Sequence, residues 1–204
     1  GGGSGCAPGG AAVHPPANGA GARGGAGNVA GGDAATGWED DCWEAGRLAA
    51  PGGTLAGSWG GMTRIDGAGL GSGANAANFG SYAGIVRQEE LAAGQVNHAL
   101  VIYASCDNGT YVYPAAKTGQ SCASVGQSNT NAPPMGTRFQ LNMSDAENTA
   151  LAVPAWKEGI LMAMAHYGLI MGDTGSTWGI KEESGRVYTS FGAPDQWATW
   201  AQTQ

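Results

Sequence analysis

His98 opens the longest apolar run in the first half of the chain, within the segment QVNHALVIYASCDNGTYVYPA that spans residues 95–115. A histidine titrates near neutral pH, so at the edge of a cleft it can act as a general base or contact a ligand. His98 is in phase with Leu100 and Ile102, which points its ring to the same side of the expected strand. The alternative is a structural histidine that is hydrogen-bonded to a backbone carbonyl. The sequence is compatible with both interpretations.

Asp173 begins the sequence Asp-Thr-Gly-Ser after a short apolar run, within residues 169–180. The same pattern forms the active-site loop of aspartic proteases, in which two aspartates share one proton. The chain holds no second copy of this pattern, so a symmetric dimer would have to supply it. The alternative is a tight turn between strands, because Asp, Thr and Gly all favour turns. An aspartic-type peptidase is therefore a remote alternative.

The remaining carboxylates form no pattern that singles out a catalytic pair. Hydrolysis of a glycosidic bond needs two acids that flank the bond. The acids available in the body of the chain are Asp66, Glu89, Glu90, Asp145, Glu147, Asp173, Glu182 and Glu183. The GxSxG nucleophile elbow, the P-loop and the dinucleotide-binding fingerprint are absent from the sequence. We therefore predict no cofactor.

Four cysteines, Cys6, Cys42, Cys106 and Cys122, are spread along the chain without a CxxC pair. Zinc sites need ligands at short spacings, so this pattern disfavours a metal site and favours disulfides. Four cysteines allow three pairings. We favour Cys106–Cys122, because an Asn-Gly turn lies between these two residues, and this leaves Cys6–Cys42 as the second pair. Disulfides predict an oxidising, extracellular location.

Composition restricts the partners of the protein. Charged residues make up only 12% of the chain and the net charge is −7, which disfavours nucleic acid and anionic membrane surfaces as partners. No apolar stretch is long enough to span a membrane. Seven tryptophans are present, and sugar rings stack on flat aromatic faces. We therefore predict a polysaccharide or cell-wall glycan as partner, with Trp59 in the binding surface.

Glycine accounts for 38 of 204 residues, and about half of the glycines precede Met62. A segment of such composition buries too little apolar surface to offset the entropy of ordering it. Residues 1–58 are therefore predicted to form a Gly/Ala-rich, loosely ordered N-terminal arm, and residues 59–204 the folded domain. The arm could join the protein to its neighbours, so self-association is a possible role for it.

Residues 98–106 are apolar on both faces and predict a central strand. Residues 109–115 follow the Asn-Gly turn and are the predicted hairpin partner of that strand. The clearest helix is predicted over residues 154–167, where apolar residues repeat at helical spacing. Shorter elements are predicted as helical segments at 87–94, after Ser144 and at 193–202, and as strands at 136–143, 169–173, 177–181 and 186–191. This pattern predicts an all-β to α+β fold, specifically an antiparallel β-sandwich of jelly-roll kind with one main amphipathic helix.

Five segments, NHALVIY, YVYPA, APPMGTRFQL, YGLIMGDTGSTWGI and APDQW, follow one another in this order. Their combination resembles an uncharacterised group of secreted bacterial proteins, over roughly residues 59–200 of this chain. No activity comes with the resemblance. It does show which residues of this chain match the motif positions of the group, and His98, Arg138, Asp173 and Trp178 are among them.

The resemblance implies roles for these residues. Arg138 would orient or neutralise Asp173, and His98, Arg138 and Asp173 would form one catalytic site. Tyr113 stands where the group has tryptophan, and we expect Tyr113 and Trp178 to contact the substrate together with Trp59.

These observations lead to a hypothesis about function. The chain is predicted to be a secreted protein that acts on polysaccharide as a glycosidase or a lyase, with His98 and Asp173 transferring protons. The alternative is a non-catalytic extracellular module that binds carbohydrate or assembles into a surface layer or fibre. In that case the motif residues only hold turns.

Overall fold

The computed structural model describes residues 28–44, 46–47, 55–175, 177–190 and 192–202. They contain three sheets and five short helices, together with one 3-10 turn, η1 (Ala123–Val125). The strands are β1 (Val29–Asp33), β2 (Trp38–Trp43), β3 (Gly46–Arg47), β4 (Leu55–Ala56), β5 (Trp59–Arg64), β6 (Leu100–Ala104), β7 (Arg138–Phe139), β8 (Leu169–Thr174) and β9 (Gly179–Ile180). The helices are α1 (Gln88–Ala92), α2 (Asp145–Ala150), α3 (Ala155–His166), α4 (Gly185–Ser190) and α5 (Gln196–Trp200).

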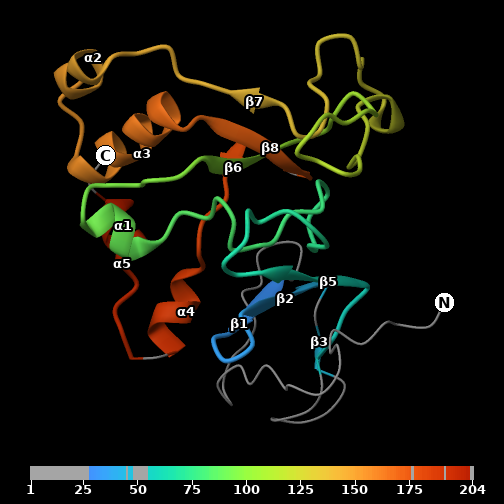
Figure 1. Cartoon of the computed structure of the whole chain (residues 1–204). Coiled ribbons are helices and arrows are strands. Elements are labelled where there is room, and N and C mark those ends of the chain that lie inside the picture. The colour runs from blue at the N-terminus through green and yellow to red at the C-terminus, as the bar shows by residue number, and fades with distance from the viewer. Residues whose placement is uncertain (1–27, 45, 48–54, 176, 191, 203–204) are drawn as a thin grey trace.

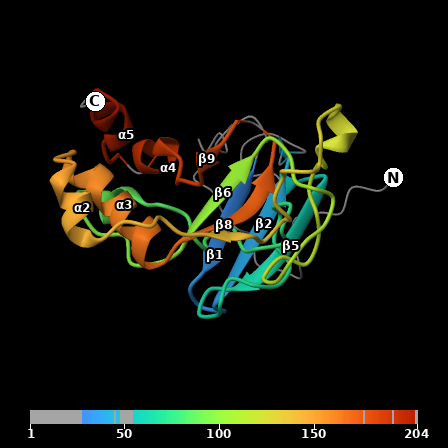
Figure 2. The same ribbon diagram turned by 90° about the horizontal axis from the view of Figure 1, so that it is seen from above.

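The two larger sheets differ in the direction of their strands. The first is antiparallel with the order β1-β2-β5, and the second is mixed with the order β7-β8-β6-β9. In Figure 1 the three-stranded sheet lies below the four-stranded sheet, and the chain that follows β5 winds between them. Figure 2 shows the two sheets one behind the other when the molecule is seen from above. The mixed α+β content is confirmed, whereas the jelly-roll sandwich is not.

β6 is the central strand that the sequence predicts. It lies between β8 and β9, and Leu100, Val101 and Ile102 are all buried. β6 has apolar residues on both of its faces because other parts of the chain cover both sides of the strand. Phe79 packs over one side, next to Gly172 of β8, and the apolar residues of α3 join the same core cluster.

The predicted hairpin partner of β6 is wrong. Residues 109–115 pair with β6 nowhere in the sheet, and their one β-bridge joins Tyr111 to Met135. The actual partners are β8, which is parallel to β6, and β9, which is antiparallel. A parallel pair needs a long crossover connection, here residues 105–168 with α2 and α3. Local sequence patterns do not reveal a partner that lies so far along the chain.

The helices follow the local signals in most places. Ser144 and Glu147 form the predicted capping box of α2, and α3 begins directly after Pro154. The predicted strand at 186–191 is wrong, because α4 occupies this segment. The hydroxyl of Ser184 accepts a hydrogen bond from the amide of Arg186, which satisfies one of the free amides at the start of that helix.

The predicted disulfide between Cys106 and Cys122 is present, and it closes the loop after β6. Cys42 is buried and disulfide-bonded, while Cys6 lies outside the described residues. The arm predicted for residues 1–58 also lies largely outside them. Within it, β1 and β2 belong to the same sheet as β5, and the domain boundary at residue 58 stays a prediction.

A pair of buried carboxyl groups holds the three-stranded sheet to the rest of the molecule. Glu39 and Asp41 lie on the same face of β2 and are each only 2% exposed. Glu39 Oε1 accepts a hydrogen bond from the amide of Tyr82 at 2.7 Å, and Asp41 Oδ2 accepts one from the amide of Ser81 at 2.9 Å. The two strand residues therefore accept hydrogen bonds from the amides of two consecutive residues in the segment that runs between the sheets.

Glu39 releases its proton less readily than an ordinary carboxyl group. Burial, the charge of Asp41 and the hydrogen bond between the two carboxyl groups raise the pKa of Glu39 to about 8. Like charges at this distance cannot both be ionised in a buried site. When Glu39 is protonated it donates to Asp41, whose Oδ1 atom has no other partner among the described residues.

Loss of the loop disulfide should destabilise the domain. The bond joins residues separated by 16 positions, and a loop of about 15 residues corresponds to about 3 kcal/mol in the chain-entropy account. We expect the double variant Cys106→Ala/Cys122→Ala to unfold in urea with a free energy lower by about 3 kcal/mol. Alkylation of either cysteine in the folded wild-type protein without reductant would contradict the bond.

The carboxyl pair should make stability depend on pH. Because the pKa of Glu39 is raised from 4.5 to about 8, the folded chain keeps a proton that the unfolded chain releases in this interval. Stability should therefore fall as the pH rises from 4.5 to about 8, by at most ~1.4 kcal/mol per pH unit. Glu39→Gln still donates to Asp41 but carries no titrating group, so its urea-unfolding free energy should depend less on pH.

Glu158→Gln on α3 is the matched control, since it removes one carboxylate without touching the pair. Its pH dependence should follow that of the wild type. Equal pH slopes for wild type and Glu39→Gln would show that the pair does not hold a proton.

Candidate functional site

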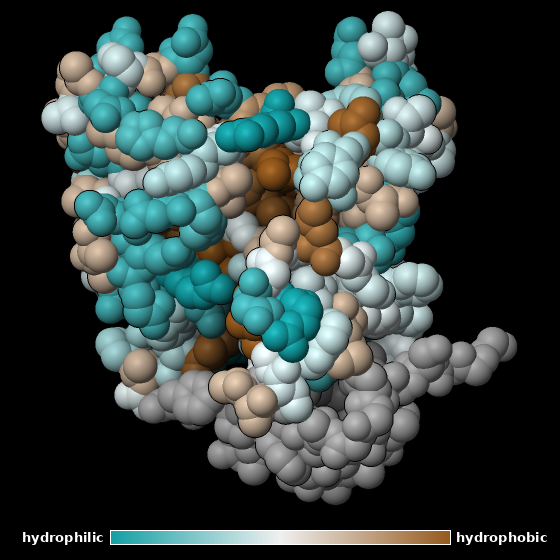
Figure 3. Space-filling model, in the orientation of Figure 1, coloured by the Kyte–Doolittle hydropathy of each residue, from teal (hydrophilic) through white to brown (hydrophobic). Residues whose placement is uncertain are grey.

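Asp173 ends up at the carboxyl end of the parallel pair β6–β8. It is in register with Tyr103 of β6, one step past a bulge in β8. Asp173 Oδ1 accepts hydrogen bonds from the amides of Thr174 at 2.9 Å and Ala76 at 3.3 Å. The carboxyl ends of parallel strands are where ligand sites form most often in open sheets. Figure 3 shows a hollow over β6 and β8 in which apolar side chains gather.

Two lysines act on the Asp173 carboxyl group. Burial raises its pKa, while the charges of Lys181 and Lys117 and the two amides oppose this effect. These are two of the three lysines in the chain. Lys181 Nζ is buried and makes no hydrogen bond with the described residues. The site therefore combines one carboxyl group with the side chains of two lysines in a chain whose net charge is −7.

Lys117 connects Asp173 to an exposed aromatic ring. Its ammonium lies 4.6 Å from the ring centroid of Trp59, within the range of a cation–π contact. Trp59 is 48% exposed, and its indole Nε1 donates to the carbonyl of Gly73 at 3.4 Å. Desolvation lowers the pKa of Lys117, and the charge of Asp173 opposes that shift. We call this cluster the polar site; its residues are Trp59, Lys117, Asp173 and Lys181.

His98 lies at the other end of the strand pair. Leu100 is in register with Leu169 and Tyr103 with Asp173, so His98 and Asp173 are about five strand positions, or ~16 Å, apart along the sheet. Both ring nitrogens of His98 have partners: Nε2 is 3.0 Å from Glu90 Oε1, and Nδ1 is 2.9 Å from the carbonyl oxygen of Ala99.

Arg138 does not reach Asp173 either. It is in register with Ile170 on β7, and its Nη2 donates to the carbonyl oxygen of Tyr167 at 2.6 Å, near the start of β8. The structure therefore does not bring His98, Arg138 and Asp173 into one cluster. Of these three, only Asp173 belongs to the polar site.

The residues predicted to contact the substrate also lie apart from one another. Trp59 lies beside Lys117, whereas Trp178 is 59% exposed and lines a second pocket with Tyr103 and Trp197. Tyr113 is 83% exposed on the loop that follows β6. The structure brings Trp59 and Asp173 together through Lys117, a residue that no sequence motif indicated. Its position two residues after the YPA segment gave no signal of its own.

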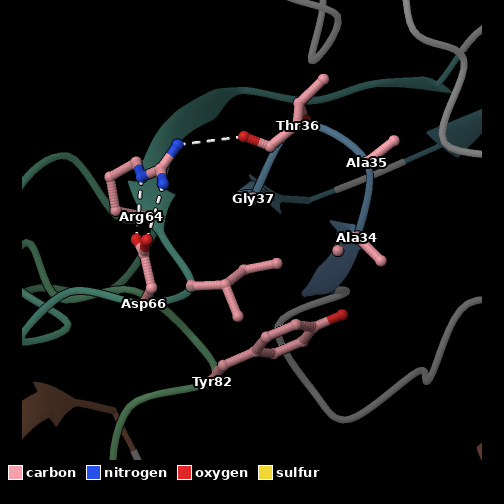
Figure 4. Close-up of a pocket in the computed structure, with 9 residues that line it drawn as sticks. Ala34, Ala35, Thr36, Gly37, Arg64, Asp66 and Tyr82 are labelled. Atoms are coloured by element: carbon pink, nitrogen blue, oxygen red, sulfur yellow. Dashed lines mark hydrogen bonds and ion pairs between the residues drawn. The ribbon is translucent and has the colours of Figure 1, made fainter.

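A larger cavity of about 680 Å³ lies next to the β1–β2 turn. Residues 34–37 form one wall and Tyr82 another (Figure 4). The Arg64 guanidinium at its edge is bonded to Asp66 at 2.7 Å and to the carbonyl oxygen of Thr36 at 3.0 Å. Arg64 also pairs with Trp38, at the end of the sheet opposite to Trp59. The charge of Arg64 is therefore paired with Asp66.

The described residues hold no group of three or more His, Cys, Asp or Glu side chains that could bind a metal ion. None of the described helices is long and apolar enough to cross a membrane.

Comparisons of the chain with models of known protein families, with curated proteins and with solved structures found no match. The resemblance to secreted bacterial proteins stays a prediction.

Proposed function

We propose that the protein acts on an acidic polysaccharide at the polar site and cleaves it by β-elimination. The observation that supports this proposal is that the charges of Lys117 and Lys181 both act on the Asp173 carboxyl group, and that Lys117 also lies over the exposed ring of Trp59. A sugar ring can stack on Trp59 while a lysine attracts its carboxylate.

Between the two kinds of polysaccharide cleavage, the surroundings of Asp173 favour the lyase. Hydrolysis needs two carboxyl groups on opposite sides of the glycosidic bond. The charged groups that shift the pKa of Asp173 are both lysines. A lone carboxyl group with lysines beside it suits a substrate that carries its own carboxylate, such as a uronate.

The reaction can be written with the groups present. The neutral amine of Lys117, which desolvation favours by lowering its pKa, removes the proton from the carbon next to the uronate carboxylate. The electron pair of that C–H bond forms the double bond to the neighbouring ring carbon, and the bond from that carbon to the glycosidic oxygen breaks. The carboxyl group of Asp173, whose raised pKa favours its protonated form, gives its proton to the leaving oxygen. No further reactant is needed.

An extracellular location is part of the same proposal. The Cys106–Cys122 bond supports it, because structural disulfides persist mainly in oxidising compartments.

The substitutions Asp173→Asn and Lys117→Met should each lower the rate of formation of unsaturated product by about 10²-fold or more, because each removes one proton-transfer group. The measurement is the ultraviolet absorbance of the unsaturated uronate, on a panel of uronate polysaccharides with purified protein. His98→Gln should retain turnover, since His98 lies at the far end of β6.

Lys157→Met is the matched control for Lys117→Met. Lys157 also stacks over a tryptophan, at 5.1 Å from the ring centroid of Trp156, but it lies on α3 away from Asp173. The control should keep full activity. New reducing ends without ultraviolet absorbance would show a glycosidase instead, and binding without any product would show a carbohydrate-binding module. If no acidic polysaccharide binds or reacts, the proposal is wrong.

A further inference from the structure

A second pocket, of about 270 Å³, lies where β6, β9, α3 and α5 meet. Six of its seven lining residues are aromatic or aliphatic, and the seventh is an acid. The lining residues are Val86, Tyr103, Ile160, Trp178, Ile180, Glu182 and Trp197. The polar site and the proposed function do not account for this pocket, although Tyr103 stands in register with Asp173.

The chemistry of the wall is unusual in three respects. Three of the lining residues, Tyr103, Trp178 and Trp197, have electron-rich rings. No lysine, arginine or histidine lines the pocket. Glu182 is its single acid, and the carboxylate of Glu182 makes no hydrogen bond or ion pair within the part of the chain that the structure describes.

Among the described residues, no positive charge contributes to the pKa shift of Glu182. Partial desolvation and the negative charge of Asp195 raise its pKa. A cation placed in the pocket would relieve both effects, because it would neutralise the carboxylate in the place where water solvates it poorly.

We infer that this pocket binds a small organic cation of the trimethylammonium type, such as a choline head group. Aromatic faces attract a quaternary ammonium through their quadrupoles, and such a group needs no hydrogen-bond acceptor. The volume is below the usual range for drug-sized ligands, which suits a head group of this size.

The position of Tyr103 offers a direct way to disturb the pocket. Its side chain lies over Gly179, where an added Cβ would be 2.4 Å from the Tyr103 hydroxyl oxygen. An alanine at this position must therefore displace the tyrosine from the wall. Gly179 is partly buried in β9 and its backbone is extended, so the change acts through Tyr103.

Isothermal titration with choline and with 3,3-dimethyl-1-butanol, its uncharged isostere, tests the inference on the full chain. Choline should bind, and the isostere should bind at least about 10-fold more weakly, because it has the same shape without the charge. Equal affinity for the two compounds, or no binding of choline, would overturn the inference.

Substitutions in the pocket test where choline binds. Trp178→Ala, Glu182→Gln and Gly179→Ala should each weaken choline binding by about 10-fold or more. The matched controls are Trp43→Ala, which removes a tryptophan that is 38% exposed on β2, and Glu158→Gln on α3. Both controls should bind choline like the wild type. Unchanged binding in all three pocket variants would place the cation elsewhere and refute the assignment.

The inference does not depend on the polysaccharide proposal. Lys117→Met disturbs the polar site but leaves the wall of this pocket intact, so it should bind choline normally. Failure of one proposal can thus be told from failure of the other.

Discussion

The buried carboxyl pair of Glu39 and Asp41 is the constraint on which the arrangement of the two sheets depends. Two carboxylates that are buried side by side repel one another unless one of them is neutral. With one proton between them, the pair can accept the amides of Ser81 and Tyr82 and remain buried. The three-stranded sheet is thereby fixed to the chain that packs against β6 and β8. As a result, β2 is part of the interior although it is a short strand with polar residues.

The geometry of the polar site depends on this contact between the carboxyl pair and the chain. Trp59 begins β5, which is paired along its whole length with β2, so the position of the ring follows from the position of the carboxyl pair. Asp173 comes from the other sheet, and Lys117 comes from the loop between β6 and β7. Three segments that are far apart in the sequence therefore meet at one place only because the sheets are held together.

The many glycines of residues 60–84 serve this close packing. A Cβ at Gly61 would lie 1.9 Å from the carbonyl oxygen of Ser72, and one at Gly73 would lie 1.5 Å from that of Phe79. Backbone segments approach each other so closely there that no other residue fits without rearrangement. After β5, glycine thus allows dense contacts between loops.

The sequence by itself determined the elements whose signals are local. The apolar run of β6, the capping box of α2, the helical spacing of α3 and the Cys106–Cys122 bond all depend on residues that are close together in the chain, so their patterns could be interpreted directly. Asp173 and Trp59 could also be named as candidates from residue type. Only the tertiary structure decided which residues meet. It paired β6 with β8 across a long connection and separated His98 from Asp173 by the length of a strand. It also placed Lys117 between Asp173 and Trp59, because pairing over long sequence distances depends on packing that no local pattern records.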